Sequence, residues 1–459
     1  MPVSNNPNPV ELPPCEHTPA PYTGPSRAEV LKTRQRYVNP GVLLYYQDPI
    51  QIVEGHMQYL WDDTGQRYLD AIAGIVVVSV GHCHPRIVEA VREQVGKLTH
   101  TTTLYLNPEV ALYAKKLAEH FPDASGLEST YFTNSGSESN ELASMMVRLH
   151  TGNFDIIALG NGYHGGLAST MSMTAMSNWK FPLPDVPGIK HAPPGYCYRC
   201  PLSLEYPSCN MKCAHSVASL IEYETSGSIA AFIAEPIQGI GGVVEPPPEY
   251  FAIVYDIIRA HGGLCISDEV QTGFGRTGTA FWGFENYGVV PDMVTMAKGI
   301  GNGWPLGAVT TRKEIAECLG ERLHFNTFAG QPVAMIQGIK TLEVIDDENI
   351  QQRAHQVGGY LKEGLLTLQE SHKLIGDVRG RGLLLGIELV RDRDTKEPAT
   401  QEAARIHELA KDRNLLIGKG GVHGNVLRIK PPMCVTKADV DFIIDCLDRV
   451  FVDQEKASG

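Results

Sequence analysis

The chain has 459 residues, of which 43% are hydrophobic and 20% are charged, a composition typical of a globular protein. Its length exceeds what a single hydrophobic core usually serves, so two or three lobes are expected. The formal net charge of −13 would repel a phosphate backbone, and no apolar stretch approaches the ~20 residues that a membrane crossing needs, which removes nucleic acid and membranes from the expected partners.

The N-terminal residues 1–25 are rich in proline and predict a mobile lead-in to the fold. They contain neither the apolar centre of a secretory signal nor the arginine-rich amphipathic pattern of a transit peptide. Ten cysteines in a chain of this length are too few for a disulfide scaffold and indicate reduced thiols. We therefore expect a cytoplasmic protein.

Residues 50–70 alternate apolar and polar side chains on either side of Asp63-Thr64-Gly65, which predicts a β-hairpin. Helical periodicity follows in residues 85–98 and 108–121. Each of these two segments opens with a proline suited to the first turn of a helix. The N-terminal part of the chain is therefore expected to pass from strands to helices.

Between about residues 129 and 312, short β-rich runs alternate with helices and with polar or glycine-rich loops. The runs span 129–134, 155–160, 229–236, 264–269, 292–297 and 306–311. This alternation predicts an α/β fold around an open, largely parallel sheet. After about residue 333 the pattern is mostly helical, and strand-like runs at 380–389 and 425–432 predict a second, smaller sheet.

Polar residues close several of these predicted strands. In chain order they are Ser135-Gly136-Ser137-Glu138-Ser139, then Tyr163 and His164, and then Glu235, Asp268 and Lys298. Ligands of open α/β sheets bind beyond the carboxyl ends of the strands. These residues are therefore the candidates for a functional site.

The chemistry of the candidates fits one cofactor. An amine at the end of a buried strand, here Lys298, loses its charge by desolvation and becomes nucleophilic. A buried carboxylate such as Asp268 needs a cationic partner, and a helix that begins at Ser135 offers unpaired N–H groups to a phosphate. An aldehyde acceptor, a partner for a cation and a phosphate seat together predict pyridoxal 5'-phosphate.

Each candidate also has an ordinary structural explanation. Lys298 would be a solvated lysine, Asp268 a helix cap or half of an ion pair, and Ser135 an N-cap. Tyr163 and His164 would be a packed aromatic ring beside a satisfied histidine. Five strand ends that carry the parts of one site nevertheless favour the cofactor.

The motifs around these residues resemble the successive signatures of class III pyridoxal-phosphate aminotransferases of fold type I. They are NSGSESNE, GYHG, AEPIQG, SDEVQTGFGRTG, TMAKGIGNGWPLGA, FNTFAGQP and VLRIKPP, in this order between about residues 40 and 452. Within the class, the chain is most similar to alanine:glyoxylate and β-amino acid:pyruvate aminotransferases. The resemblance implies a large α/β domain, with a mainly parallel seven-stranded sheet between helices, and a smaller α+β domain.

The expected domain boundaries follow from this resemblance and from the pattern of the chain. Residues 26–75 would form the N-terminal segment of the small domain, and residues 76–332 would form the large cofactor-binding domain. Residues 333–459 would complete the small domain. An insertion at about 182–216 interrupts the large domain.

The resemblance also implies a role for each candidate. Lys298 would bind the cofactor covalently and move a proton between substrate and cofactor, while Asp268 would keep the pyridine nitrogen protonated. Gln271 would contact the ring 3'-oxygen, and Tyr163 would stack on the ring. The remaining cofactor contacts would be Ser135, Gly136, Ser137, His164, Glu235 and Thr327. Because the family donates this threonine from the other subunit, the resemblance implies a homodimer with shared sites, which could pair further into a tetramer.

Arg428 is the candidate for binding the substrate. It lies inside an apolar strand-like run, where an unpaired guanidinium would be costly, so it needs an anion. A substrate carboxylate would serve, and so would an internal acidic side chain. The resemblance favours the α-carboxylate, and it implies that Glu235 contacts the cofactor or pairs with an active-site arginine.

Four cysteines in the insertion depart from a generic member of the family. Cys197, Cys200, Cys209 and Cys213 form a C-x2-C-x8-C-x3-C pattern. Four thiolates at such spacing could hold a structural zinc ion, although the two pairs are closer together than in common zinc ribbons. Free thiols or a redox pair are the alternatives, and no catalytic metal is expected.

The predicted reaction is a ping-pong transamination. A small amino donor, such as alanine, β-alanine or 3-aminoisobutyrate, would leave its nitrogen on the cofactor, and glyoxylate or pyruvate would then collect it. Two alternatives stay open at this point. One is a phospholyase that eliminates phosphate from an aminoalkyl phosphate. The other is a non-catalytic binding protein, which would need neither Lys298 nor Asp268.

Overall fold

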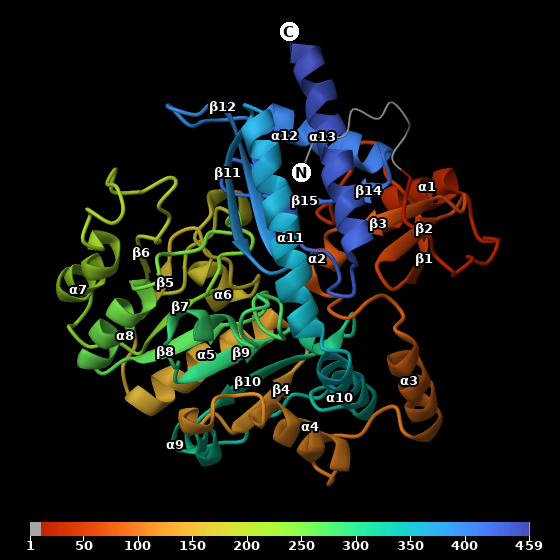
Figure 1. Cartoon of the computed structure of the whole chain (residues 1–459). Helices are drawn as coiled ribbons and strands as arrows, with labels where there is room; N and C mark the ends of the chain where they lie inside the picture. Colours follow the sequence, from red (N-terminus) through yellow and green to blue (C-terminus); the bar gives the residue numbers. More distant parts are fainter. Residues whose placement is uncertain (1–10, 459) are drawn as a thin grey trace.

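The computed structural model describes residues 11–458, and its largest sheet has seven strands (Figure 1). The strand order is β4-β10-β9-β8-β7-β5-β6, and only β10 runs against its neighbours. The strands are β4 (Ser129–Thr133), β5 (Ile156–Leu159), β6 (Ile189–Ala192), β7 (Ala231–Ala234), β8 (Leu264–Asp268), β9 (Met293–Met296) and β10 (Gly307–Thr311). The predicted α/β fold with a mainly parallel seven-stranded sheet is confirmed.

Helices cover both faces of this sheet because its strands are apolar on both sides. Ile157 and Phe232 pack toward α7 (Lys212–Glu224) and α8 (Tyr250–Ala260). The alternate positions of the same strands pack toward α5 (Gly136–Thr151). Burial on both faces explains why these strands appear in the sequence as continuous apolar runs.

Strand β6 was not predicted. It lies at the edge of the sheet and pairs only with β5. Two of its four residues, Lys190 and His191, are polar and half-buried. An edge strand that meets solvent on one side lacks the apolar run that marks the central strands.

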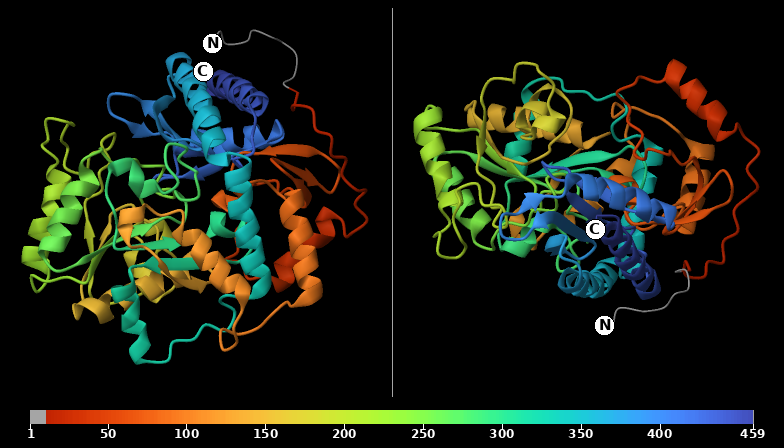
Figure 2. Two further views of the ribbon diagram at one scale, coloured as in Figure 1. Left: turned by 60° about the horizontal axis from the view of Figure 1, so that its bottom comes forward. Right: turned by 90° about the horizontal axis from the view of Figure 1, so that it is seen from above.

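The predicted hairpin forms part of a second sheet. Strands β1 (Ile52–His56), β2 (Tyr59–Asp62) and β3 (Arg67–Asp70) pair antiparallel in this order. Gly65, with φ of +84°, lies in the turn between β2 and β3. The fourth strand, β14 (Leu415–Leu416), comes from the C-terminal part of the chain and pairs parallel with β3. Two distant segments of the sequence therefore share one sheet. In both views of Figure 2 the orange N-terminal strands lie beside blue C-terminal segments.

The third sheet lies above the seven-stranded sheet in Figure 1 and consists of C-terminal strands. They are β11 (Ile375–Arg381), β12 (Leu384–Asp392), β13 (Glu397–Pro398), β15 (Gly418–Gly420) and β16 (Val426–Ile429). The remaining helices are α1 (Arg27–Tyr37), α2 (Ala73–Val76), α3 (Pro85–Lys97), α4 (Pro108–Ala118), α6 (Ala168–Met173), α9 (Lys313–Ala316), α10 (Pro332–Asp347), α11 (Ile350–Ser371), α12 (Thr400–Asp412) and α13 (Lys437–Ser458).

The domain boundaries remain a proposal. Helix α10 packs against α3 and α4, so a boundary at residue 332 would separate it from the helices it contacts. We propose that the large domain extends to the end of α10. Residues 1–10 of the expected lead-in lie outside the described part. Residues 11–25 contact the second sheet, where Ala20 N–H donates to Glu54 Oε2 at 3.0 Å and Arg67 donates to the Pro13 carbonyl at 2.8 Å.

Within residues 11–458, no helix is both long enough and apolar enough to cross a bilayer.

Candidate active site

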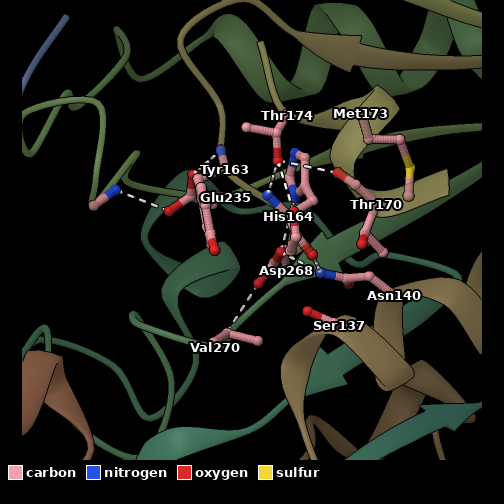
Figure 3. Close-up of polar contacts among 12 residues, drawn as sticks. Ser137, Asn140, Tyr163, His164, Thr170, Met173, Thr174, Glu235, Asp268 and Val270 are labelled. Atoms are coloured by element: carbon pink, nitrogen blue, oxygen red, sulfur yellow. Dashed lines mark hydrogen bonds and ion pairs between the residues drawn. The ribbon is translucent and has the colours of Figure 1, made fainter. Parts of the chain in front are cut away.

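The carboxyl ends of β5, β7 and β8 bring together the residues predicted there. Asp268 ends β8 and has 2% of its surface exposed. Its Oδ2 accepts hydrogen bonds from Asn140 Nδ2 and from His164 Nδ1, both at 2.8 Å, and its Oδ1 accepts from the Val270 N–H at 3.2 Å (Figure 3). These donors satisfy the buried carboxylate, and a lone pair of Oδ1 remains for a cation such as a protonated ring nitrogen.

Glu235 follows β7 and is held by two backbone groups. Its Oε1 accepts from the Tyr163 N–H at 3.0 Å, and its Oε2 accepts from the Gly239 N–H at 2.8 Å. Burial and the nearby charge of Asp268 raise the pKa of Glu235. Within the described part of the chain it forms no ion pair with Arg428. The arginine contact that the resemblance implied is therefore not made in this structure.

The ring of Tyr163 is braced on one side by Trp179. The two ring centroids lie 5.1 Å apart in an edge-to-face arrangement. The ring is half-buried, and the backbone of Tyr163 is fixed by Glu235. This packing holds a flat aromatic surface beside the two carboxylates.

Lys298 follows β9 and has an unusual backbone conformation. Its φ is +52°, in the left-handed region that residues other than glycine seldom adopt. Such local strain clusters at functional sites. Burial lowers the pKa of Lys298 to about 8, although Glu235 and Asp268 act in the opposite direction. The neutral, nucleophilic amine is therefore far more abundant near physiological pH than in an ordinary lysine, and it becomes the main form above a pH of about 8.

The start of α5 has the features that bind an anion in other proteins. Ser135 caps the helix by accepting a hydrogen bond from the Glu138 N–H at 3.2 Å. The N–H groups of Gly136 and Ser137 have no hydrogen-bond partner among residues 11–458. With the positive end of the helix dipole, they form a seat for a phosphate.

The loop after β5 closes on this helix start. The Gly166 N–H donates to Ser137 Oγ at 3.1 Å. Gly165 has φ of +137°, and a Cβ at this position would lie 2.5 Å from Ser137 Oγ. Only glycine fits there, so the GYHG motif is required by the close approach of the loop to α5.

Arg428 on β16 has no acidic partner among residues 11–458. Its Nη2 donates to the Lys419 carbonyl at 2.8 Å and its Nη1 to the Gly239 carbonyl at 3.5 Å. Its Nε is buried without a partner, and no acidic side chain forms an ion pair with it within residues 11–458. The structure thus disfavours the alternative of an internal acid and leaves the guanidinium able to bind an external carboxylate.

Thr327 is next in sequence to a residue that contacts the start of α5. It is exposed and forms no hydrogen bond with another described residue. Its neighbour Asn326 bonds to Asn134 at 3.0 Å and to Glu138 at 3.2 Å. Thr327 therefore lies in a segment that is anchored near the start of α5.

Two buried residues of this site were not predicted. Asn140 lies one turn into α5, inside the NSGSESNE motif, and its spacing from Gly136 could have placed it on the same helix face. Lys430 follows β16, and its Nζ donates to Gln271 Oε1 at 3.0 Å. The sequence did offer one indication of Lys430, because this lysine directly follows the apolar run at 426–429.

The four cysteines of the insertion are free thiols. Residues 11–458 contain no group of three or more histidine, cysteine, aspartate or glutamate side chains arranged to hold a metal ion. The zinc alternative therefore has no support in this structure. Burial and the neighbouring cysteines raise the pKa of the Cys197 thiol to about 11, so it stays protonated at neutral pH.

The insertion is instead fixed to the third sheet by ionic contacts. Tyr196 and Arg199 both donate hydrogen bonds to the carboxylate of Glu388 on β12. Arg379 on β11 pairs with the same carboxylate at 2.7 Å. These contacts connect the insertion of the large domain to the C-terminal sheet.

Comparisons with known proteins agree with this geometry. The family model named Aminotransferase class-III matches residues 45–451. A protein of Arabidopsis thaliana named alanine–glyoxylate aminotransferase 2 homolog 2, mitochondrial, is 51% identical over 437 residues, which cover 95% of this chain and 90% of the relative. The Homo sapiens protein named alanine–glyoxylate aminotransferase 2, mitochondrial, is 42% identical over 454 residues. These cover 95% of this chain and 88% of the human protein.

Two solved structures bear on the cofactor and on the reaction. An amine transaminase from an uncultivated Pseudomonas species, in its PLP-bound form, has a TM-score of 0.85 and 29% identity and covers 91% of this chain and 98% of its own. A phospholyase from Arthrobacter in complex with phosphoethanolamine has a TM-score of 0.84 and 32% identity. The match covers 92% of this chain and 99% of the phospholyase chain. One scaffold therefore serves both reactions that the sequence left open.

The expected cytoplasmic location is contradicted, because the names of both curated relatives place them in mitochondria. The expectation rested on the first residues and on the number of cysteines. Reduced thiols do not identify a compartment, and a targeting segment is removed from the mature protein and leaves no trace in its fold. Neither the first residues of the chain nor its number of cysteines was therefore sufficient to predict a cytoplasmic location.

The residues present fit pyridoxal 5'-phosphate. Lys298 offers an amine whose pKa is lowered, Asp268 offers a free lone pair to a cation, and the start of α5 offers unpaired N–H groups to a phosphate. This arrangement, the match over residues 45–451 and the extensive identity to the relatives agree. The chain belongs to the class III aminotransferases.

Proposed function

We propose that this aminotransferase uses pyridoxal 5'-phosphate to move an amino group from a small amino acid to glyoxylate or pyruvate. The donor would be L-alanine or a small ω-amino acid such as β-alanine or 3-aminoisobutyrate. The observation that carries the proposal is the grouping of Lys298, Asp268 and the start of α5 at the carboxyl ends of the strands. The names of the two curated relatives support alanine and glyoxylate as the pair of substrates.

The bound cofactor supplies an electron sink for the negative charge that develops on the substrate carbon that carries the amino group, which is Cα in L-alanine. Lys298 would hold the cofactor through its amine and would take the proton from that carbon. Asp268, fixed by Asn140 and His164, would keep its negative charge facing the ring nitrogen. The N–H groups of Gly136 and Ser137 would hold the phosphate. These residue roles are our proposal.

Arg428 would bind the substrate's carboxylate. Its guanidinium has an unpartnered Nε and no acidic partner in the described part of the chain. Carboxylate recognition by a buried guanidinium selects amino and oxo acids over simple amines. Amino donor and oxo-acid acceptor would bind in turn to the same seat, as a ping-pong reaction requires.

The proposal is tested by following the amino nitrogen from L-alanine to glyoxylate. The purified enzyme would be incubated with pyridoxal phosphate, glyoxylate and L-alanine that carries a heavy nitrogen isotope. We expect labelled glycine and pyruvate in equal amounts, and neither product from Lys298→Ala. Unlabelled glycine, or more pyruvate than cofactor present when glyoxylate is left out, would contradict the proposal.

The same preparation tests the phospholyase alternative, because phosphoethanolamine is the ligand in the Arthrobacter structure. Inorganic phosphate released from phosphoethanolamine without an oxo acid would establish a lyase. We expect no release beyond that of the Lys298→Ala control.

We also propose that two copies of the chain form a homodimer. Exposed apolar side chains are concentrated in two loops, where Leu104 is 77% exposed and Phe328 is 64% exposed. Apolar patches of this kind mark interaction surfaces. Thr327 lies in the second loop and would reach the cofactor phosphate of the other subunit. Light scattering should give the mass of two chains, and a monomer that retains full activity would refute shared sites.

A further inference from the structure

Lys430 is a buried lysine with no role in the proposed chemistry. Only 1% of its surface is exposed. It follows β16 two positions after Arg428, so both side chains lie on the same face of the strand. A lysine seldom occupies such a position without a specific partner.

The amine of Lys430 makes two hydrogen bonds within the described residues. Its Nζ donates to the Gly239 carbonyl at 3.2 Å and to Gln271 Oε1 at 3.0 Å. Gln271 is also buried, and its Nε2 has no hydrogen-bond partner among residues 11–458. The Oε1 atom of Gln271 is therefore fixed by Lys430, while its Nε2 can still donate a hydrogen bond to a ligand.

The charges around Lys430 favour the neutral amine. The nearest charged groups are Arg428 on β16, Lys298 after β9, Arg276 in the loop after β8 and Glu235 after β7. Burial and the positive neighbours lower the pKa of Lys430 well below its usual value, against the opposing effect of Glu235. The amine has at least two N–H groups in either charge state, so both hydrogen bonds can form without a positive charge.

The backbone at Gly239 restricts the amide further. A Cβ at Gly239 would lie 2.4 Å from Gln271 Oε1, so the chain packs directly on the amide. The Gly239 carbonyl accepts hydrogen bonds from both Lys430 and Arg428. Lys430 is therefore joined to the residue proposed to contact the cofactor ring and to the residue proposed to bind the substrate.

We propose that Lys430 is a positioning residue, which fixes Gln271 so that its Nε2 donates a hydrogen bond to the ring 3'-oxygen of bound pyridoxal phosphate. This inference rests on the proposed function. Without Lys430, the amide of Gln271 would be free to turn and to present its oxygen instead. A positioning effect would then appear in the spectrum of the bound cofactor as well as in the rate.

The test is a pH titration of the visible absorbance of the enzyme with bound cofactor and no substrate. A donor to the 3'-oxygen stabilises negative charge there and lowers the pH at which the absorbance changes. Lys430→Met removes both N–H groups but keeps the length of the side chain. We expect the midpoint to rise by roughly one pH unit in this variant. Gln271→Leu should raise it by a similar amount.

The double variant separates positioning from a direct charge effect. If Lys430 acts through Gln271, Lys430→Met together with Gln271→Leu should shift the midpoint no further than Gln271→Leu alone. An additive shift would overturn the inference, because a charge effect would persist without the amide. A lower melting temperature with an unchanged midpoint would assign Lys430 a structural role only and would also overturn it.

Lys411 on α12 provides the matched control. It is also buried, and it contacts Glu408 and Asp412 rather than Gln271. Lys411→Met should leave the midpoint unchanged. If Lys430→Met does not fold, Lys430→Gln serves in its place. A wild-type protein with no visible absorbance after incubation with pyridoxal phosphate would refute the proposed function itself, which distinguishes that failure from an unchanged midpoint in the Lys430 variant.

Discussion

His164 Nδ1 lies 2.8 Å from Asp268 Oδ2, and both side chains are almost fully buried. A carboxylate can only accept, so His164 donates through Nδ1. Its Nε2 is buried without a hydrogen-bond partner among the described residues. His164 therefore orients the carboxylate of Asp268 and has no free path to a substrate.

Asp268→Asn should reduce kcat by about 10²- to 10³-fold, because it removes the charge opposite the ring nitrogen while keeping the shape of the side chain. The cofactor should still bind, which visible absorbance would verify. His164→Gln keeps that charge and should cost less. Wild-type kcat in Asp268→Asn would contradict the role proposed for this residue.

The lowered pKa of Lys298 predicts how fast the apoprotein captures its cofactor. The nucleophile is the neutral amine, which predominates above a pKa of about 8. The capture rate should rise as the pH increases through that value and level off above it. Stopped-flow absorbance between about pH 6 and about pH 10 measures the rate. A midpoint near the ordinary lysine value of about 10.4 would show that burial does not activate the amine.

Arg428→Ala should raise KM for L-alanine and glyoxylate by about 10²-fold, because a charge-assisted bidentate contact contributes roughly 3 kcal/mol. An amine donor without a carboxylate, such as isopropylamine, should lose little. Steady-state kinetics with both donors provide the comparison. Equal losses for the two donors would remove the proposed role.

Glu388→Gln should destabilise the protein by about 3 kcal/mol, because it removes the buried charge that pairs with both Arg379 and Arg199, although Asp377 still pairs with Arg379. Although burial opposes it, Arg379 holds the pKa of Glu388 below its usual value. This contribution to stability is therefore present above the unfolded pKa of about 4.3 and is lost as the pH falls through the lower folded value.

Glu397→Gln is the control for this change, because Glu397 forms an exposed pair with Arg391. It should cost less than about 1 kcal/mol. Urea unfolding of both variants at neutral pH gives the difference. Equal urea midpoints for the two variants would mean that the pairing of Glu388 does not stabilise the contact between the insertion and the third sheet.

The large sheet could be predicted from the sequence because its central strands are buried on both faces and form apolar runs. Edge strand β6 could not, since Lys190 and His191 interrupt its pattern. The hairpin around Gly65 was predictable from local turn chemistry. Its pairing with β14 was not, because it joins segments separated by more than 340 residues.

Lys298 and Asp268 could be predicted as site residues because each closes an apolar strand. The contact between Lys430 and Gln271 depends on how β16 packs on the loop after β8, which no local pattern encodes. The spacing of the four cysteines indicated a possible metal site, but spacing alone does not fix where the thiols point. Whether Thr327 contacts a cofactor phosphate depends on the proposed homodimer, which no local pattern of the sequence encodes.

The most direct test of the central claim is the visible absorbance of the enzyme with bound cofactor through one half-reaction at a time. Addition of L-alanine without an acceptor should bleach the band as the nitrogen moves onto the cofactor. Glyoxylate added after removal of alanine should restore it, and Lys298→Ala should show neither change. A band that alanine and β-alanine leave unchanged would contradict a transaminase that uses these donors.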